Sequence, residues 1–420
     1  MWNRLTKRMV SHLIKSGNLT LHLSNGTTFE TDNPHGPRVT VRLHDPSLPG
    51  KLIRNPELAL GEAYMDGTLT VDGDDIRGLL TLVVCNFGQG NLPASQKIAR
   101  KLRIAKRKWD QWIPLRRARA NAEHHYDIST QFYNLFLDED RQYTCAYFRD
   151  PDFTLEEAQA AKKKHIADKL LIKPGMRVLD IGSGWGGLAI TLARDYGAHV
   201  TGVTLSKEQL AAATARAKAA GVANKVTFEL LDYRNVTQKF DRIVSVGMLE
   251  HVGQPQYATY FGQIERNLKE DGIALIHFIG RTSEPGNLSP WFQKYIFPGG
   301  YTPALSEVLT VVERTTLEQA DIEVWRTHYD RTLREWLYRF EARLPEVRDL
   351  GYDERFIRMW RYYLIASELS LSDMPHVLFH LQLQKHQTTV PVTRDYLYDK
   401  YARKPHSAFP PEQPDLKAAE

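Results

Sequence analysis

The sequence predicts an α/β protein with a doubly wound, mostly parallel sheet, together with a smaller α+β amino-terminal domain. Residues 178–187 read VLDIGSGWGG, a short apolar run typical of a central parallel strand, followed directly by a glycine-rich turn. Apolar strands then alternate with helix-length segments as far as residue 279. The composition, 42% hydrophobic and 25% charged in 420 residues, is that of a globular protein. Together these observations indicate a large sheet covered by helices.

The glycine-rich turn predicts a ligand site. Gly182, Gly184 and Gly186 permit a sharp turn and a close approach of the backbone to a ligand, and residues 188–196 continue as a helix. This arrangement suits a nucleotide-like ligand, although a tight turn without any ligand has the same pattern. The spacing is GxGxG rather than GxGxxG, and Asp180 precedes the first glycine. In both respects the turn resembles the nucleoside-binding turn of S-adenosylmethionine-dependent methyltransferases.

Residues 1–95 are expected to form the smaller domain. Alternating segments at residues 19–23 and 27–30 flank an Asn25-Gly26 pair, which is typical of a β-hairpin. Two further strands and a helix are expected at residues 38–44, 66–71 and 75–84. No residues in this part have a catalytic spacing, so it does not by itself indicate a function.

Residues 96–120 are predicted to be a basic linker. Tryptophans and aliphatic residues are interleaved with its basic residues, and the only acidic residue is Asp110. This composition fits a segment that touches an anionic membrane surface, and it fits equally a solvated helix that packs on a neighbouring domain. RNA binding is a third interpretation, but no RNA-binding motif accompanies the charges. The basic residues are Lys97, Arg100, Lys101, Arg103, Lys106, Arg107, Lys108, Arg116, Arg117 and Arg119.

Residues 121–420 are expected to form the large domain. A capping box, TLEE at residues 154–157, opens a helix that runs to about residue 171. After the central strand, strands are expected at residues 199–204, 226–231, 241–246 and 273–279. Helices are expected at residues 207–220 and 256–269, with a turn at Asp271-Gly272 before the last strand. A helix near residues 306–320 and closing strands at 322–328 and 377–384, separated by a helical insertion, complete the domain.

Charge, cysteines and hydropathy limit the classes of partner. A net charge of +5 does not imply nucleic-acid binding, and no nucleic-acid partner is expected. Cys85 and Cys145 have no CxxC spacing, so neither a metal site nor a disulfide framework is expected, and a reducing compartment suits them. No apolar run is long enough to span a bilayer, and the first residues lack a signal-peptide pattern. We therefore expect a cytoplasmic protein that meets a membrane only from its surface.

Several polar residues follow predicted strands, where a doubly wound sheet binds its ligands. Gln209 can reach ribose hydroxyls, and it can also close a capping box. Asp232 suits the amino group of adenine, although it can equally be an ordinary loop residue. Glu250 lies at the end of the fourth strand. His277 and Cys145 stand among apolar residues, where a purely structural role is the alternative.

Taken together, the motifs of the large domain resemble the cyclopropane-fatty-acyl-phospholipid synthase family. They have the family's order and spacing over about residues 125–363: YTCAYF, VLDIGSGWGG, GVTLSKEQ, DYR, FDRIVSVGMLEHVG and WFQKYIFPGG. The resemblance implies a sheet of the class I methyltransferase type and, more loosely, an amino-terminal lipid-engaging domain. It also implies transfer of a methylene group from S-adenosylmethionine to a cis double bond of a phospholipid acyl chain, with bound bicarbonate as general base. Such an enzyme would be peripheral on the inner face of the membrane.

The resemblance also implies site residues, matched motif by motif. The catalytic pocket is expected to contain Cys145, Glu250, His277, Ile279 and Tyr329, with Glu250 and His277 orienting the bicarbonate. The cofactor is expected to contact Tyr143, Thr144, Gly182, Gly184, Thr204, Leu205, Gln209, Asp232 and Tyr233. Aromatic residues that can stabilise a carbocation are Tyr147, Trp291, Phe292, Tyr295, Phe297 and Tyr301.

One segment departs from the family pattern. Residues 366–372 read ASELSLS, where a cysteine and an aromatic-arginine pair are usual, so acyl-chain or headgroup choice can differ. The sequence leaves open a methyl- or methylene-branched product, methylation of a small molecule at nitrogen or oxygen, and a silent lipid-binding protein on the same scaffold. The expected partner is a phospholipid bilayer with unsaturated acyl chains, and the sequence allows a homodimer.

Overall fold

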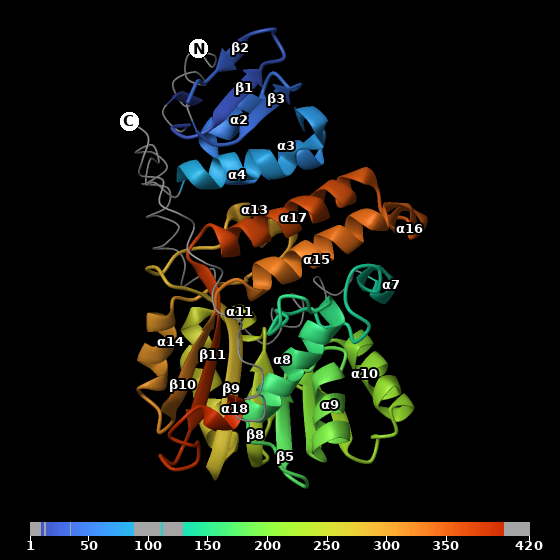
Figure 1. Cartoon of the computed structure of the whole chain (residues 1–420), viewed down its shortest axis with the longest axis vertical. Helices are drawn as coiled ribbons and strands as arrows, with labels where there is room; N and C mark the ends of the chain where they lie inside the picture. Colours follow the sequence, from blue (N-terminus) through green and yellow to red (C-terminus); the bar gives the residue numbers. More distant parts are fainter. Residues whose placement is uncertain (1–9, 12–13, 34, 88–110, 112–128, 399–420) are drawn as a thin grey trace, which may run out of the picture.

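The computed structural model describes residues 10–11, 14–33, 35–87, 111 and 129–398. Along its long axis lie a small sheet with its helices, then a layer of helices, and then the large sheet (Figure 1). Apart from Gln111, the predicted basic linker at 96–120 and both of its boundaries lie outside the described residues. The division at residues 95 and 120 therefore stays a prediction.

The amino-terminal part is a four-stranded sheet in the order β2-β1-β3-β4 with helices on one side. The predicted hairpin forms: β1 and β2 pair antiparallel around Asn25-Gly26, while β1 and β3 are parallel. The strand expected at 66–71 is shorter, because Gly67 has a left-handed φ of +69° just after α3. The elements are β1 Asn18–His22, β2 Thr28–Glu30, β3 Arg38–Leu43, α2 Leu48–Arg54, α3 Pro56–Met65, β4 Leu69–Val71 and α4 Ile76–Phe87.

The large sheet has seven strands in the order β10-β11-β9-β8-β5-β6-β7. The strands from β9 to β7 in this order are all parallel, and β11 is antiparallel to both of its neighbours. The predicted doubly wound, mostly parallel sheet is confirmed. Its strands are β5 Arg177–Ile181, β6 His199–Thr204, β7 Val226–Leu230, β8 Phe240–Val246, β9 Leu268–Arg281, β10 Glu318–Trp325 and β11 His376–Gln384.

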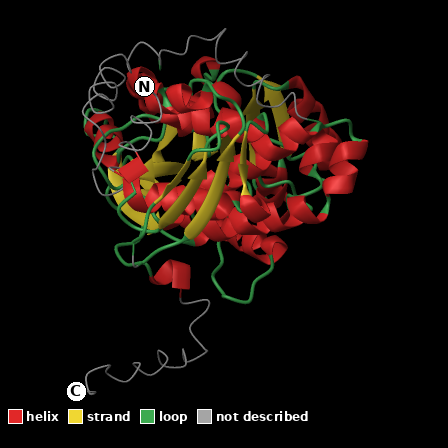
Figure 2. Ribbon diagram, turned by 90° about the horizontal axis from the view of Figure 1, so that it is seen from above, coloured by secondary structure: helices red, strands yellow, loops and turns green. Residues whose placement is uncertain are grey.

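Helices cover both faces of this sheet (Figure 2). Successive strand residues point to opposite faces, so Val178 packs with helices α8–α10 and Leu179 packs in the core beneath α12 and α14. The predicted capping box is present, because Thr154 and Glu157 each accept a hydrogen bond from the other's backbone N–H. These helices are α8 Leu155–Lys169, α9 Gly187–Tyr196, α10 Lys207–Ala219, α11 Leu249–Val252, α12 Tyr257–Asn267 and α14 Leu305–Val312.

A layer of helices joins the two sheets (Figure 1). Helix α17 packs on α15 on one side and on α3 and α4 on the other. Glu368 of α17 is buried and accepts hydrogen bonds from both Arg77 of α4 and Arg334 of α15. One hydrophobic cluster includes residues of the amino-terminal sheet, of α15 and of α17. The remaining helices are α7 Thr130–Tyr133, α13 Pro290–Tyr295, α15 His328–Ala342, α16 Leu344–Asp349, α17 Glu354–Ser372 and α18 Asp395–Tyr398.

Two sequence predictions were wrong in their boundaries. The expected turn at Asp271-Gly272 lies inside β9, where the pairing with β8 shifts register and the extra residues bulge out of the ladder. The helix expected near 306–320 ends at Val312, because the Thr315 hydroxyl donates to the Val312 carbonyl and accepts from the N–H of Leu317. Strand β10 therefore begins at Glu318, earlier than the predicted 322–328.

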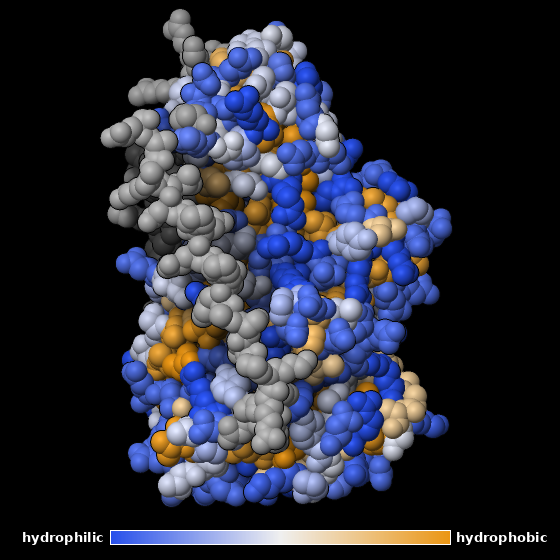
Figure 3. All heavy atoms as spheres, in the orientation of Figure 1, coloured by the Kyte–Doolittle hydropathy of each residue, from blue (hydrophilic) through white to orange (hydrophobic). Residues whose placement is uncertain are grey.

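The surface gives two facts about membranes. Of the helices that the structure describes, none combines the length and apolar character needed to cross a bilayer. Hydrophobic atoms reach the surface where the amino-terminal part meets the helical layer (Figure 3).

Candidate functional site

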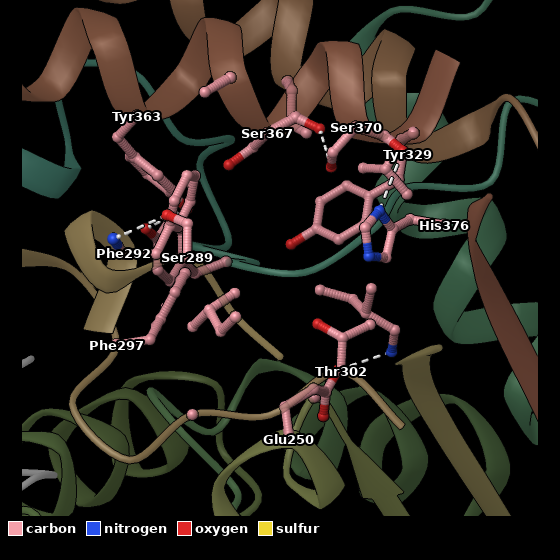
Figure 4. Close-up of a pocket in the computed structure, with 18 of the residues that line it drawn as sticks. Glu250, Ser289, Phe292, Phe297, Thr302, Tyr329, Tyr363, Ser367, Ser370 and His376 are labelled. Atoms are coloured by element: carbon pink, nitrogen blue, oxygen red, sulfur yellow. Dashed lines mark hydrogen bonds between the residues drawn. The ribbon is translucent and has the colours of Figure 1, made fainter. Parts of the chain in front are cut away.

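A single cavity of about 750 Å³ contains all of the residues expected in the catalytic pocket and all of those expected at the cofactor. It begins at the carboxyl edge of the large sheet, passes α17, and extends among the aliphatic side chains of the amino-terminal part. In Figure 4, Glu250 lies on the sheet side, Tyr329 points into the middle, and Ser367 and Ser370 of α17 lie opposite. The fold thus brings together predicted site residues from Tyr143 to Tyr329, and with them residues of the amino-terminal part and of α17.

The glycine-rich turn joins β5 to α9 at this edge. Gly182, Gly184 and Gly186 have φ values of +81°, +53° and +81°, in the left-handed region that favours glycine. The backbone N–H groups of Gly182 and Ser183 donate to the carbonyl of Val203 on β6, which holds the turn against the neighbouring strand. A Cβ at Gly184 would meet no described atom within 4 Å, so this glycine faces open cavity.

Thr204 and Gln209 form a buried pair at the end of β6. The Thr204 hydroxyl donates to Oε1 of Gln209 at 2.9 Å, which leaves the Nε2 group of Gln209 buried with no protein partner among the described residues. Ser206 caps α10 by accepting from the N–H of Gln209, so half of the predicted capping box is present. The Gln209 amide is therefore held in place with N–H groups available to a ligand.

Asp232 and Tyr233 follow β7. Both carboxylate oxygens of Asp232 accept from Arg234, which fixes the orientation of this side chain. The buried Tyr233 hydroxyl has no hydrogen-bond partner in the described part of the chain. If Asp232 accepts a hydrogen bond from an adenine amino group, as expected, the accepting oxygen is one that also accepts from Arg234.

Tyr143 and Thr144 are held by buried partners that sequence reasoning did not identify. The Tyr143 hydroxyl shares a hydrogen bond of 2.8 Å with the Tyr363 hydroxyl. The Thr144 hydroxyl accepts from Nζ of Lys162 at 2.8 Å. Burial lowers the pKa of Lys162 to about 8. Because Lys162 and Tyr363 lie in helices far from the recognised motifs, local sequence gave no signal for either.

Glu250 follows β8 in α11 and points into the cavity (Figure 4). Its Oε1 accepts from the backbone N–H of Ile279 at 2.6 Å, while its buried Oε2 accepts from no donor that the structure describes. Burial raises the pKa of Glu250 to about 7, and the hydrogen bond from Ile279 opposes this rise. The carboxyl group is thus poised between its acid and base forms near neutral pH.

The remaining residues of the expected catalytic set are His277, Cys145 and Tyr329, and all three line the cavity. Nδ1 of His277 is hydrogen-bonded to Nε2 of His380 at 2.8 Å, and its Nε2 has no described partner. Burial lowers the pKa of His277 well below its ordinary value, and the charge of Lys162 adds to this effect. The Cys145 thiol donates to the Ala146 carbonyl, and burial raises its pKa, so a thiolate is disfavoured.

The amino-terminal part contributes a long aliphatic wall to the cavity. Residues 19–21 and 41–43 alternate, and their inward-facing aliphatic side chains are buried and line the cavity. The lining residues are Val10, Ile14, Leu19, Leu21, Val41, Leu43, Leu52, Leu60, Leu69, Leu79, Leu80, Leu82, Val83 and Val84. The segment that departs from the family pattern, residues 366–372, also contributes to the cavity on α17, through Ala366, Ser367, Leu369, Ser370 and Leu371.

The aromatic candidates divide into two groups. Phe292, Phe297 and Tyr301 line the cavity, and Figure 4 shows the first two beside Tyr363. The other candidates were wrong, because each packs elsewhere. Trp291 donates to Sδ of Met65 in α3, Tyr295 donates to Glu62, and Tyr147 stacks on Trp325 with ring centroids 4.6 Å apart.

The residues present fit both expected small molecules. Buried polar atoms of Asp180, Gln209 and Tyr233 lack partners among described residues, and these residues line the same cavity as the glycine turn, as a polar nucleoside would require. Oε2 of Glu250 and Nε2 of His277 lack partners in the same part of the structure and line the same cavity, as a small hydrogen-bonding anion would require.

The strand order, the glycine turn and this ring of polar atoms define a class I S-adenosylmethionine-dependent methyltransferase. The chain matches the family described as mycolic acid cyclopropane synthetase over residues 114–380, and it belongs to that family. A domain of unknown function matches residues 5–89.

Relatives with assigned names resemble most of the chain. It is 42% identical over 326 residues to the cyclopropane-fatty-acyl-phospholipid synthase of Escherichia coli K12, covering 78% of this chain and 82% of that protein. It is 35% identical over 381 residues to the tuberculostearic acid methyltransferase of Mycobacterium tuberculosis, covering 87% of this chain and 86% of that protein. The predicted family resemblance is thereby confirmed.

Solved structures agree with the fold. A mycolic acid cyclopropane synthase complexed with SAH and CTAB matches with a TM-score of 0.60 at 30% identity, over 66% of this chain and 100% of that chain. A coclaurine N-methyltransferase matches with a TM-score of 0.64 over 78% of this chain and 99% of that chain, but at 24% identity this likeness shows the fold alone.

Proposed function

We propose that this enzyme transfers a methylene group from S-adenosylmethionine to the cis double bond of an unsaturated phospholipid acyl chain, with bicarbonate as the general base. One observation carries the proposal: the glycine turn, the Glu250–His277 pair and the aliphatic wall of the amino-terminal part line one continuous cavity. An acyl chain has the apolar length that such a wall would bury, and 42% identity to a named phospholipid synthase supports the same substrate class.

The chain's own residues account for the demands of this reaction. Bound S-adenosylmethionine supplies an electrophilic methyl group, and bound bicarbonate supplies a basic oxygen. An alkene is a weak nucleophile, so the walls around Tyr329 and Ile279 must hold the double bond close to the reacting centre. Faces of Phe292, Phe297 and Tyr363 can stabilise positive charge that develops on the acyl chain. The aliphatic wall excludes water, which would otherwise capture that charge.

Glu250 and His277 would hold the anion between their partnerless atoms. In its neutral form Glu250 can donate from Oε2, while the ionised form would repel an anion, and a pKa of about 7 allows the neutral form at physiological pH. His277 is neutral because of burial, so its Nε2 can accept or donate one hydrogen bond without adding charge.

The dependence of the reaction rate on dissolved carbonate tests whether bicarbonate is the general base. Removing dissolved carbonate by degassing should lower the wild-type rate, and adding it back should restore the rate. A Glu250→Leu variant, which has no hydrogen-bonding group at this position, should keep its affinity for S-adenosylmethionine in calorimetry and lose about 10²-fold or more in turnover, since a preorganised hydrogen-bond partner is worth that much. A wild-type rate that does not depend on carbonate would reject the role of bicarbonate and would mean that a side chain acts as the general base.

A methyl-branched product is the second candidate. It follows from the same methyl transfer if the cation loses a proton to form a double bond instead of closing a ring, which gives an unsaturated branched chain, and the likeness to a tuberculostearic acid methyltransferase favours it. Mass spectrometry of lipids from cells expressing the chain should show the gain of one CH2 per acyl chain, and NMR of the isolated fatty acid separates a cyclopropane ring from a branch. Lipids without any added carbon would reject both candidates.

Peripheral attachment to the inner face of the membrane belongs to the same proposal. The hydrophobic surface atoms at the junction of the two parts and the basic residues of 96–120 support it (Figure 3). The homodimer that the sequence allows stays a prediction, which light scattering of the purified protein tests.

A further inference from the structure

A row of polar side chains crosses three strands beside the cavity. Glu323 on β10 lies directly opposite His380 on β11, and His380 lies directly opposite His277 on β9. Helix α8 covers this face and contributes His165 and Lys169. His277 and His380 are 1% and 0% exposed, among otherwise apolar neighbours. The proposed function uses His277 alone and gives no role to His380 or Glu323.

The hydrogen bond between the two imidazoles admits two proton arrangements. Burial lowers the pKa of both His277 and His380 well below the ordinary value, so both rings are neutral and one proton lies between Nδ1 of His277 and Nε2 of His380. If His277 donates, its Nε2 presents a lone pair to the cavity. If His380 donates, His277 presents an N–H to the cavity instead.

The surroundings of His380 favour the first arrangement. A carboxylate oxygen of Glu323 and ring nitrogens of His165 and His380 lie within 4.8 Å of one another. Because Nε2 of His380 is committed to His277, Nδ1 is the nitrogen left for this cluster, and the structure gives it no other partner among described residues. An N–H at this nitrogen is attracted to a carboxylate, whereas a lone pair is repelled.

Glu323 is ionised. Burial opposes the charged form, but the hydrogen bond from His165 and the charge of Lys169 outweigh burial and lower the pKa of Glu323. Nζ of Lys169 lies 2.7 Å from both Glu323 and Asp321, so its charge is shared between two carboxylates. Lys162 also lies near His380 and His277, and its ammonium donates to Gln142 and Thr144.

We propose that Glu323 and His380 are positioning residues that fix the tautomer of His277, with the proton on Nδ1 and Nε2 as a proton acceptor toward the cavity. Glu323 attracts the Nδ1 proton of His380, so the Nε2 lone pair of His380 must accept from His277. Glu323 on the edge strand β10 thereby determines whether Nε2 of His277 accepts or donates a hydrogen bond in the cavity. The tautomer assignment itself does not depend on the proposed function. Only the use of Nε2 of His277, which would accept a hydrogen bond from the hydroxyl group of bicarbonate, rests on the proposed function.

The same three residues, His165, Glu323 and His380, resemble a ligand set for a divalent cation. The Lys169 ammonium disfavours that assignment, because it lies 2.7 Å from Oε2 of Glu323 and its positive charge would repel a cation bound by this carboxylate. Elemental analysis of the purified protein decides the point: one equivalent of zinc or iron would overturn the proposal, and no bound metal agrees with it.

Long-range proton–nitrogen NMR on the histidine-labelled full chain tests the tautomer without any turnover. We expect the wild-type spectrum to show His277 protonated at Nδ1 alone. Glu323→Gln should shift the population toward the Nε2–H form, and Glu323→Asp, which keeps the carboxylate, should restore the wild-type pattern. Gln382→Met is the control, since Gln382 lies on β11, the strand of His380, and bonds the Lys169 carbonyl instead.

Activity gives the second measurement. Glu323→Gln should lower kcat about 10-fold or more, as loss of a correctly protonated partner does, with unchanged affinity for S-adenosylmethionine. A wild-type His277 protonated at Nε2, or a folded Glu323→Gln variant with the wild-type tautomer and kcat, would overturn the proposal. A wild type that has the expected tautomer yet adds no carbon to lipids would refute the proposed function and leave the tautomer assignment standing.

Discussion

The carboxylate of Glu250 accepts a hydrogen bond from the backbone N–H of Ile279 at 2.6 Å, and this contact joins the turn after β8 to β9. Glu250 lies in α11, just after β8, and Ile279 lies in β9; these two strands are parallel neighbours, which places their carboxyl ends at one edge of the sheet. One carboxylate oxygen is thus fixed by backbone, and the other stays available to a ligand.

The burial of Glu250 predicts a measurable pH dependence of stability. Its pKa is raised from 4.5 to about 7, so the folded protein keeps a proton that the unfolded chain releases in this range. The stabilisation is complete below pH 4.5 and is lost as the pH rises through 7. Glu250→Gln should therefore gain thermal stability relative to the ligand-free wild type between about pH 5 and about pH 8.

Asp180→Asn provides the comparison for that measurement. Burial also raises the pKa of Asp180 to about 7, so the same sign of change is expected at a second site in the cavity. A difference in Tm between wild type and Glu250→Gln that is constant across this pH range would contradict the buried carboxyl assignment.

Gly184→Val should abolish binding of S-adenosylmethionine while the protein stays folded. The new side chain would meet no described atom, but it would fill the space beside the turn, and a φ of +53° adds roughly 1–2 kcal/mol of strain. Gly221→Val is the matched control, with a φ of +71°, the same open surroundings and a position outside the cavity. Calorimetry measures the affinity; a folded Gly184→Val with wild-type affinity would remove the glycine turn from the cofactor site.

Gly61→Ala should weaken the junction between the two parts of the molecule. A Cβ at Gly61 would lie 2.3 Å from Cδ1 of Trp291, which is fully buried and bonded to Met65. Gly262→Ala, in α12, meets no described atom and should instead stabilise by about 0.5–1 kcal/mol. Thermal unfolding measures both effects. If Gly61→Ala raised the Tm as much as Gly262→Ala does, Trp291 would move aside at little cost, and the tight packing at this junction would be contradicted.

The basic residues of 96–120 should make vesicle binding depend on salt. Binding to anionic vesicles should weaken as the Debye length falls from about 10 Å at 0.1 M to about 3 Å at 1 M. Replacing Lys106, Arg107 and Lys108 by Gln should weaken binding at low salt, at about 1 kcal/mol per basic residue near lipid. Co-sedimentation with vesicles measures the effect. Binding that ignores salt, or no binding, would favour the interpretation of this segment as a packed linker.

Sequence alone determined the chemistry-bearing part of this protein. The run VLDIGSGWGG predicted a strand, a turn and a helix because its glycines and β-branched residues restrict the backbone locally. The alternation of strands and helices predicted the parallel sheet, and parallel strands bring Asp232, Glu250 and His277 to one edge without further information. Errors occurred at the Asp271-Gly272 turn and the helix near 306–320, where register with β8 and a threonine hydroxyl decided the boundaries.

Only the tertiary structure decided what surrounds that edge. The aliphatic residues of β1, β3 and α4 line the cavity, and hydrophobic alternation by itself cannot distinguish a filled core from the wall of a cavity. Lys162, Tyr363 and His380 gave no local signal, since each acts through a partner more than 15 residues away in sequence. The pairing of His277 with His380 and Glu323 depends on strand register, which is set by long-range packing rather than by any short stretch of sequence.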